Sequence, residues 1–411
     1  MPEFLELLPP GAALARLMAH LPDVAVRAEE IDTHRALGRV SARPVTAPEA
    51  LPAFARSTVD GYAVRARDTF GSSDALPAYL ALTGETPMGS APSFRLEPGQ
   101  AALIHTGGML PEGADAVVML EHTQTARGGE VEILRAVAPG ENVLHPGEDV
   151  APGQVVLPAG KVLRPAEIGG LMALGWVRVS VAQQPVAGIV STGDEVIDPA
   201  RAPQPGQVRD VNSYTLSALV ERAGGCPRRY GILPDRRQAL RDALARALPE
   251  CDLVVITAGS SASTRDLTAE VIDELGKPGV LVHGVNVKPG KPTILAVCDG
   301  KPVIGLPGNP VSALVIANLF VVPVIRRLLG LAEGAWQSSV SARLTTNVPS
   351  QAGREDWFPV RLTGEAGHYR AEPIFYKSNL IFTLAQADGM VHIPPDATGL
   401  EVGAEVTVYF W

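Results

Sequence analysis

The stretch GVNVKPGKPTILAVCDGKPVIGLPGNPVS, residues Gly284–Ser312, contains two short apolar runs, two lysines and one tight turn. The second apolar run, Val303–Leu306, has the length and composition of a buried strand. The residues PGNP at 307–310 interrupt it before a long apolar run follows. Because Asn309 is a favourable N-cap and Pro310 a favourable first helical residue, the stretch predicts a strand, a turn and a helix.

The same stretch has the features of a phosphate-binding site. Gly308 allows the backbone to turn sharply near a ligand, and the free NH groups at the start of the helix favour an anion. Lys288 and Lys291 flank Pro289-Gly290, so both ammonium groups can reach one small region. Taken alone, Lys-Pro-Gly-Lys is equally consistent with an ordinary solvated turn.

Two further apolar runs end in small polar or acidic loops. Val186–Val190 leads into Ser191-Thr192-Gly193-Asp194-Glu195, and Leu253–Ile256 leads into Thr257-Ala258-Gly259-Ser260-Ser261. In an open α/β sheet, ligands bind at the carboxyl ends of the strands. Strand ends with glycine, hydroxyl and carboxylate groups therefore predict one binding crevice, and they favour the phosphate interpretation of the two lysines.

Composition limits the class of protein. The chain has 411 residues, 46% of them hydrophobic, which predicts a soluble protein of about two to four domains. Its formal net charge of −9 argues against nucleic acid as a partner, because binding to the phosphate backbone needs a broad basic surface. We expect a cytoplasmic protein with no membrane partner, because no signal sequence is recognised and the apolar run 311–325 is too short and interrupted to span a bilayer. A buried helix is predicted there.

Cysteines and histidines show no pattern of a metal site. Cys226, Cys251 and Cys298 are widely spaced without a C-x-x-C pair, which indicates a reducing compartment and buried structural thiols. The histidines are isolated in sequence and form no H-E-x-x-H pattern, so structural or surface positions are favoured for them.

Changes in the pattern of apolar residues and in the number of turn residues divide the chain into four regions. Residues 1–46 and 147–180 mix helical and strand-like runs and predict an arm domain, whereas 47–146 have the short β-type runs and many turns of a β-rich lobe. Residues 181–330 predict a central, doubly wound α/β domain, and 331–411 predict a small C-terminal β-barrel. The predicted fold class is therefore multidomain, α/β plus β.

Three aspartates have an ordinary structural interpretation. Asp60-Gly61 is a strong turn signal, so Asp60 is first interpreted as a turn former. Asp235 precedes the helical run 236–248 and is first interpreted as an N-cap, as is Asp266 for its own helix. Local sequence alone assigns none of the three to catalysis.

Five motifs, in order, resemble those of the molybdopterin molybdenumtransferase family, which includes the bacterial MoeA-type proteins and the carboxy-terminal domain of gephyrin. The motifs are RSTVDGYA at 56–63, LPEGADAVV at 110–118, STGDE at 191–195, KPGKP at 288–292 and LPGNPVS at 306–312. The resemblance runs over nearly the whole chain. It implies an elongated, four-domain homodimer, with shared active sites and the arm in dimerisation. It also implies insertion of molybdate into adenylated molybdopterin with release of AMP, in molybdenum cofactor biosynthesis.

The resemblance also implies roles for individual residues. The implied substrate-binding residues are Lys288, Lys291, Pro307, Gly308, Pro310, Ser312, Thr106, Asp149 and Ser261. The implied catalytic residues are Asp194, Glu195, Asp235, Asp266 and Asp60. Glu195 and Asp266 would hold Mg²⁺, which prefers oxygen ligands and would shield charge during pyrophosphate cleavage. Asp60, Thr106 and Asp149 would reach the crevice from the lobe of the other subunit.

Two other functions remain open at this point. Molybdopterin adenylyltransferases and competence-damage-type nucleotide hydrolases share the α/β domain, although the extra lobe and C-terminal domain count against them. A molybdopterin adenylyltransferase is also a candidate partner. A degenerate scaffold or binding protein remains open because loop 258–266 departs from the family pattern Gly-Gly-x-Ser-x-Gly-Asp-x-Asp, losing glycines and one acid.

Overall fold

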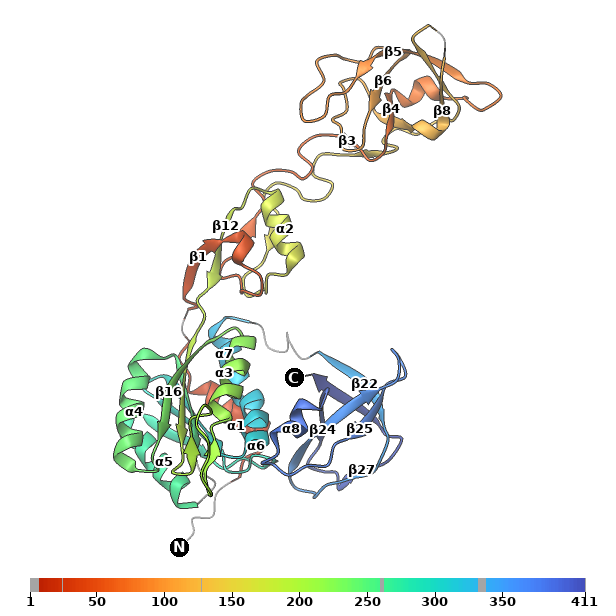
Figure 1. The fold of residues 1–411 in the computed structure, drawn as a ribbon. Helices are drawn as coiled ribbons and strands as arrows, with labels where there is room; N and C mark the ends of the chain where they lie inside the picture. Colours follow the sequence, from red (N-terminus) through yellow and green to blue (C-terminus); the bar gives the residue numbers. More distant parts are fainter. Residues whose placement is uncertain (1–6, 24, 127, 259–261, 332–337, 411) are drawn as a thin grey trace.

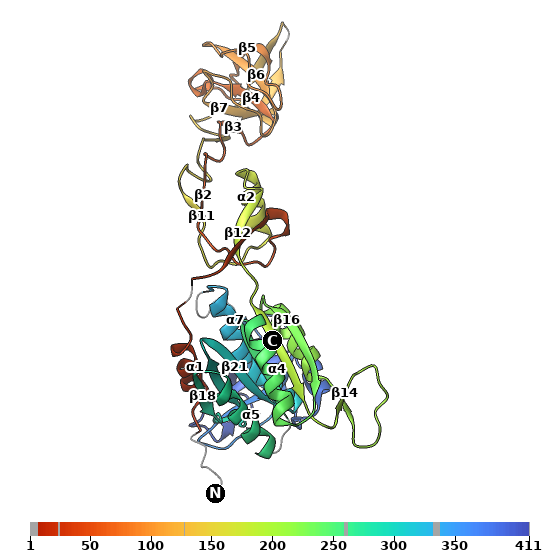
Figure 2. The same cartoon turned by 90° about the vertical axis from the view of Figure 1, so that its left-hand side faces the viewer.

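The computed structural model describes residues 7–23, 25–126, 128–258, 262–331 and 338–410. The molecule is elongated, with a β-rich lobe at one end, a short arm in the middle, and an α/β unit beside a β-barrel at the other end (Figure 1). A view turned by 90° shows the same order along the long axis (Figure 2). The predicted fold class, multidomain α/β plus β, is confirmed.

A six-stranded sheet in the order β16-β13-β17-β21-β20-β18 forms the centre of the α/β unit. The first four strands are parallel, β20 runs antiparallel to β21, and β18 runs antiparallel to β20. The register places Ser191 beside Thr257 and Thr257 beside Leu306, so the predicted strand ends meet at one edge. The strands are β13 (Val186–Thr192), β16 (Cys226–Leu233), β17 (Leu253–Ala258), β18 (Pro278–His283), β20 (Ile294–Cys298) and β21 (Lys301–Pro307).

Helices cover both faces of this sheet, which makes it doubly wound. On one face, α4 (Arg237–Glu250) and α5 (Ala262–Leu275) bury apolar side chains such as Leu244 and Ile272 against the strands. On the other face lie α1 (Pro10–Ala19), α3 (Asn212–Arg222) and a long helix that follows β21. The small strands β14 (Val196–Ile197) and β15 (Val208–Arg209) pair outside the main sheet.

The long helix is a core helix. It consists of α6 (Pro310–Ile316), a π-helical segment η4 (Ala317–Val321) and α7 (Val322–Leu328). Pro323 has no backbone NH to donate, which is consistent with the departure from α-helical pairing just before it. The 19 residues are apolar enough by length and composition to cross a membrane, but 61% of the apolar window is buried inside the protein. The predicted buried helix is confirmed.

The position of α1 corrects one prediction. Residues 1–46 are predicted to belong to the arm, but α1 buries Ala13 and Leu17 in the core of the α/β unit. Arg327 of α7 also donates a hydrogen bond to the backbone carbonyl of Met18 at 3.0 Å. The spacing of Ala13 and Leu17 puts both on one helical face, and the sheet edge at β18 and β20 covers that face. The other domain boundaries stay predictions.

The arm is built from two segments of the chain that pair with each other. Its strands and helices are β1 (Ala28–Asp32) with β12 (Arg178–Ala182), β2 (Val45–Thr46) with β11 (Val155–Leu157), the short 3-10 turn η1 (Thr33–Arg35) and α2 (Pro165–Ala173). Leu157, Leu163 and Leu171 are buried in its small core.

The lobe contains a six-stranded sheet in the order β7-β4-β6-β5-β9-β8, with separate apolar clusters on its two faces. The elements are β3 (Arg56–Ser57), β4 (Gly61–Val64), η2 (Ala66–Thr69), β5 (Ala78–Glu85), β6 (Gln100–Ile104), β7 (Ala116–Met119), η3 (Leu120–His122), β8 (Thr123–Thr125), β9 (Glu130–Ile133) and β10 (Val143–Leu144).

The C-terminal strands β24-β25-β22-β28-β26 form a barrel that the pairing of β26 with β24 closes. The short strand β19 of the α/β unit adds to β24 in parallel, placing Val287 beside Glu355 and Lys288 beside Asp356. The elements are β19 (Val287–Lys288), β22 (Ser339–Leu344), β23 (Val348–Pro349), β24 (Glu355–Thr363), β25 (Arg370–Pro373), α8 (Ile381–Ala385), β26 (Gly389–Ile393), β27 (Gly399–Leu400) and β28 (Glu405–Phe410). The pairing of β19 with β24 joins the barrel to the lysine-containing stretch 284–312.

The cysteines are free thiols, and two of them are buried as predicted. Cys251 and Cys298 lie in the core, whereas Cys226 is exposed. The prediction of a buried thiol is wrong for Cys226, because it begins β16, which is the edge strand of the central sheet.

Candidate active site

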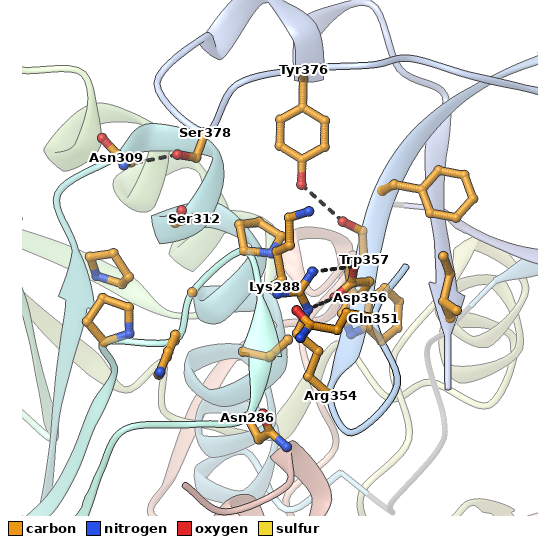
Figure 3. Close-up of a pocket in the computed structure, with 18 of the residues that line it drawn as sticks. Asn286, Lys288, Asn309, Ser312, Gln351, Arg354, Asp356, Trp357, Tyr376 and Ser378 are labelled. Carbon is orange, nitrogen blue, oxygen red and sulfur yellow. Dashed lines mark hydrogen bonds and ion pairs between the residues drawn. The ribbon is translucent and has the colours of Figure 1, made fainter. Parts of the chain in front are cut away.

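A cavity of about 750 Å³ lies where the carboxyl edge of the central sheet meets the barrel (Figure 3). The α/β unit contributes the lysine turn and the turn after β21, including Lys288, Gly290, Lys291, Pro307, Gly308 and Ser312. The barrel contributes polar and aromatic side chains, including Gln351, Arg354, Asp356, Trp357, Tyr376 and Ser378. The cavity therefore needs both units.

The Lys-Pro-Gly-Lys turn is anchored in the protein. Pro289 and Gly290 are buried, whereas the two lysines are exposed. Gly290 has a φ of 122°, and a Cβ added there would lie 2.3 Å from the side chain of Ile316. The buried Thr293 hydroxyl donates a hydrogen bond to the carbonyl of Gly290 at 2.6 Å. The structure thus brings Lys288 and Lys291 to one cavity on a fixed turn.

Arg354 adds a third cation that sequence reasoning missed. Its Nε donates to Asp356 Oδ1 at 2.8 Å and its Nη2 donates to Asp356 Oδ2 at 3.3 Å. Asp356 is only 6% exposed, so this bidentate contact fixes the guanidinium at the cavity wall. The available signal was the charged triplet Arg354-Glu355-Asp356 within the region 331–411 that is predicted to form the barrel.

Contacts around the start of α6 also join the two units. Asn309 occupies the N-cap position as predicted, but its side chain makes no cap hydrogen bond and donates instead to the Ser378 hydroxyl at 3.0 Å. The Tyr376 hydroxyl donates to the carbonyl of Trp357 at 3.1 Å. Burial, together with the charge of Asp356, raises the pKa of Tyr376, so it stays a protonated donor. Pro310 starts α6 but does not line the cavity.

A buried polar network lies along the strand edge beside this cavity. Ser191 donates to Asp210 Oδ1 at 3.1 Å, and Ser213 donates to Asp210 Oδ2 at 2.5 Å. Asn212 Nδ2 donates to the carbonyl of Gly308 at 2.7 Å, while its buried Oδ1 accepts no hydrogen bond from a described residue. This network links the turn after β21 to the end of β13, and its members Asp210, Asn212 and Ser213 lie outside the motifs found in the sequence.

Three of the predicted acidic residues lie close together just after the carboxyl ends of β13 and β16, namely Asp194, Glu195 and Asp235. Asp194 and Glu195 are exposed in the turn after β13, and the backbone NH of Asp235 donates to Asp194 Oδ1 at 3.3 Å. Burial raises the pKa of Asp235, and the charges of Glu195 and Asp194 raise it further. The Thr192 side chain opposes this rise, although its hydroxyl does not reach hydrogen-bond geometry with the buried Asp235 Oδ1. The N-cap interpretation of Asp235 is wrong, because Arg236 occupies that position.

The raised pKa of Asp235 predicts a stability effect. A carboxyl whose pKa is higher in the folded than in the unfolded protein destabilises the fold once pH rises above that value. We therefore expect Asp235→Asn to unfold at a higher temperature than the wild type at pH 7, with the difference shrinking as pH falls toward 4. Thermal unfolding with EDTA present measures it. A variant that is less stable at pH 7 would show that the charged form is stabilised instead.

The described residues contain no group of three His, Cys, Asp or Glu side chains that could hold a metal ion. The backbone of Asp266 lies in α5, but its side chain is outside the described part of the chain, and so is Ser261. Asp194, Glu195 and Asp235 supply oxygen donors of the kind that Mg²⁺ prefers. The donor type fits the ion, although the placement of these three side chains does not form a metal-binding group, and the Glu195–Asp266 pair stays a prediction.

The remaining predicted residues lie far from the cavity within one chain. Asp60 and Thr106 flank β4 and β6 in the lobe, at the opposite end of the molecule from α6 (Figure 1). Asp60 Oδ1 accepts a hydrogen bond from the backbone NH of Thr106 at 2.8 Å. Asp149 is exposed where the arm meets the lobe, and its backbone NH donates to the carbonyl of Leu51. One chain therefore brings Asp60 and Thr106 together but not to the lysines.

Comparison with known proteins gives matches along the whole chain. Family models match the MoeA N-terminal region (domain I and II) at residues 8–175, a probable molybdopterin binding domain at 188–327 and the MoeA C-terminal region (domain IV) at 341–411. The molybdopterin molybdenumtransferase of Nostoc sp. is 35% identical over 385 residues, which cover 92% of this chain and 88% of the relative.

Two further relatives show the same extent of similarity. The molybdopterin molybdenumtransferase of Haemophilus influenzae is 30% identical over 398 residues, covering 96% of each chain. The crystal structure of the molybdopterin biosynthesis MoeA protein from Pyrococcus horikoshii OT3 superposes with a TM-score of 0.87 at 33% identity, covering 99% of this chain and 100% of that one. Sequence and fold thus agree over the lobe, the arm, the α/β unit and the barrel, and the chain belongs to the MoeA family of molybdopterin molybdenumtransferases.

Proposed function

We propose that the protein inserts molybdate into adenylated molybdopterin and releases AMP, as a molybdopterin molybdenumtransferase of molybdenum cofactor biosynthesis. The observation that carries this proposal is the cavity in which Lys288, Lys291 and Arg354 converge from two structural units. Relatives that match nearly the whole chain have that enzyme name, which favours it over a function of the α/β unit alone.

The charge of the cavity suits an oxyanion. Three cations and one described carboxylate, Asp356, give the lining a formal charge of +2, although the whole protein has −9. Arginine presents a planar set of donors to an oxyanion and lysine a mobile point charge. Because Asp356 already holds one side of Arg354, the remaining guanidinium NH groups can face a bound molybdate or phosphate.

The acidic residues at the neighbouring strand ends have a different role in this proposal. Cleavage of the phosphoanhydride requires a proton donor, and it requires stabilisation of the negative charge that develops on the leaving phosphate. Asp235, whose pKa is raised, can hold a proton there. Glu195, together with Asp266, would hold Mg²⁺, which would shield the phosphate charges when bound.

The proposal includes a homodimer with shared active sites. Asp60, Thr106 and Asp149 lie in the lobe or at its junction with the arm, so a second subunit would bring them to the cavity. We further propose a cytoplasmic location and a molybdopterin adenylyltransferase partner that supplies the adenylated substrate. Neither nucleic acid nor a membrane is a proposed partner.

The test uses purified protein, adenylated molybdopterin, molybdate and Mg²⁺. We expect AMP release and active cofactor in equal amounts, both dependent on molybdate and both reduced by EDTA. ATP consumption with unadenylated molybdopterin would instead indicate the adenylyltransferase reaction. Neither AMP nor cofactor from well-folded protein would overturn the proposal and favour a scaffold.

A further inference from the structure

His105 lies between two carboxylates at the end of the lobe that carries Asp60. Its Nδ1 is 3.5 Å from Asp60 Oδ1, and its Nε2 is 3.1 Å from Glu85 Oε1. Sequence reasoning favoured structural or surface positions for the histidines. The side chain is 44% exposed, but its two ring nitrogens face two different acids, which an ordinary surface position does not require.

The strands β4, β5 and β6 bring Asp60, Glu85 and His105 together. Gly61 of β4 pairs with Ile104 of β6 in antiparallel register, so the preceding Asp60 lies opposite the following His105. The end of β5 is fixed because the buried Thr86 makes backbone and side-chain hydrogen bonds to the carbonyl of Leu103. Glu85, just before it, is thereby held beside His105.

Hydrogen bonding to Asp60 is one-sided. Oδ1 accepts from the Thr106 backbone NH at 2.8 Å and the Thr106 hydroxyl at 3.3 Å, and His105 approaches the same oxygen. No described residue donates a hydrogen bond to Oδ2. The backbone NH of Thr106 lowers the pKa of Asp60 most, with smaller contributions from the Thr106 hydroxyl and His105. Asp60 is therefore an ionised carboxylate whose Oδ1 is held by hydrogen bonds, whereas Oδ2 has no described donor and the side chain is 56% exposed.

The imidazole can connect both acids only in one protonation state. Neutral imidazole has one N–H and can donate to Asp60 or to Glu85, whereas the imidazolium can donate to both. The groups that face His105 in the described structure are Asp60, from the bend before β4, and Glu85, from the end of β5.

We propose that His105 is a positioning residue for Asp60: anchored on Glu85, it fixes one carboxylate oxygen so that the other faces the ligand in the partner subunit's cavity. This inference rests on the proposed function, because it assigns Asp60 to a site shared between two subunits. It adds a residue outside the motifs that carry the family resemblance.

The experiment compares full-length variants in the AMP-release assay between pH 5 and 8. His105→Phe keeps an aromatic ring but removes both nitrogens, His105→Gln keeps one donor, and Glu85→Gln removes the negative charge of the anchor. His368→Phe is the matched control, because His368 is exposed in the loop between β24 and β25 and does not line the cavity. We expect His105→Phe to lower kcat/KM about tenfold through misplacement of Asp60, His105→Gln to restore part of it, and His368→Phe to match the wild type.

Two further readouts separate positioning from a structural role. The double variant Glu85→Gln/His105→Phe should have the same kcat/KM as His105→Phe, because both changes break the same set of contacts between Glu85, His105 and Asp60. Loss of His105 removes one contact that lowers the pKa of Asp60, so ¹³C NMR of the Asp60 carboxyl should show a higher pKa in His105→Phe than in the wild type.

The possible failures can be told apart. If the wild type makes no cofactor, the proposed function fails, and the NMR titration still tests whether His105 lowers the pKa of Asp60. If the wild type is active and Asp60→Asn inactive, but His105→Phe keeps the wild-type kcat/KM and the wild-type titration of Asp60, this inference alone is overturned. Should His105→Phe fold poorly, His105→Gln and Glu85→Gln provide the same comparison.

Discussion

Replacing both Lys288 and Lys291 by alanine is expected to slow molybdate insertion by about 10²- to 10⁴-fold. Each ammonium group would make charge-assisted hydrogen bonds to the bound anion worth about 1.5–3 kcal/mol. Losing both removes about 3–6 kcal/mol of binding to the transition state, and each 1.4 kcal/mol is about tenfold in rate. Arg354 would remain with Asp356 as its ion-pair partner, so the cavity would lose most of its positive charge.

The thermal stability of this double variant should be nearly that of the wild type. Both lysines are exposed, and neither forms an ion pair with a residue that the structure describes, so no buried acid loses its counter-ion. A matched control is Arg201→Ala with Lys277→Ala, which removes two exposed cations elsewhere on the α/β unit. The measurements are AMP release under single-turnover conditions and the unfolding temperature. Insertion at the wild-type rate would mean that the anion binds elsewhere, and it would support the scaffold alternative.

The lysine side of this site could be predicted because it is local in sequence. The strand, turn and helix around Pro307-Gly308 follow from the apolar run and from proline and glycine chemistry, and parallel strands bring their carboxyl ends to one edge. The barrel side could not be predicted in the same way. Arg354 and Ser378 reach the cavity only because β19 pairs with β24 and Asn309 bonds to Ser378, and these contacts depend on how two units pack.

The same distinction explains the corrections. An amphipathic helix near the N-terminus was predictable from its apolar spacing, but the surface that covers Ala13 and Leu17 was not, because spacing identifies a buried face without its partner. Asp235 precedes a helix as an N-cap would, yet burial, and after it the charges of Glu195 and Asp194 from another strand end, raises its pKa. His105 has no signal in sequence, since the two acids that face it come from the end of β5 and from the bend before β4.

Gly61→Ala is expected to destabilise the lobe by about 3 kcal/mol or more. A Cβ added to Gly61 would lie 2.0 Å from the carbonyl oxygen of Val118 and 2.8 Å from its carbonyl carbon. Both atoms are backbone atoms of β7, the strand paired with β4, so no side-chain rotation can relieve the overlap. Overpacking alone costs about 1–3 kcal/mol, and the strands must also separate and lose ladder hydrogen bonds worth about 1 kcal/mol each.

Hydrogen exchange is the suitable measurement, because it follows the stability of the lobe separately from that of the other units. Peptides covering β4, β6 and β7 should lose protection in Gly61→Ala, while those of the central sheet keep it. Gly169→Ala is the control: Gly169 is helical and exposed in α2, with no atom within 4 Å of an added Cβ, so alanine should stabilise by about 0.5–1 kcal/mol. Unchanged exchange in β4 would show that the two backbones are not so close.

The effect of Gly61→Ala should extend to activity at temperatures where the lobe is still folded. Moving β4 away from β7 displaces Asp60, which immediately precedes Gly61. Thr106 and His105 follow β6, which pairs with the opposite edge of β4 and is not pushed by the added methyl group. The hydrogen bond from the Thr106 NH to Asp60 would then lengthen and the carboxylate would lose its orientation. Gly61→Ala should therefore lower kcat/KM even at 10 °C, and an additional Asp60→Asn change should add little, because the two substitutions disable the same carboxylate.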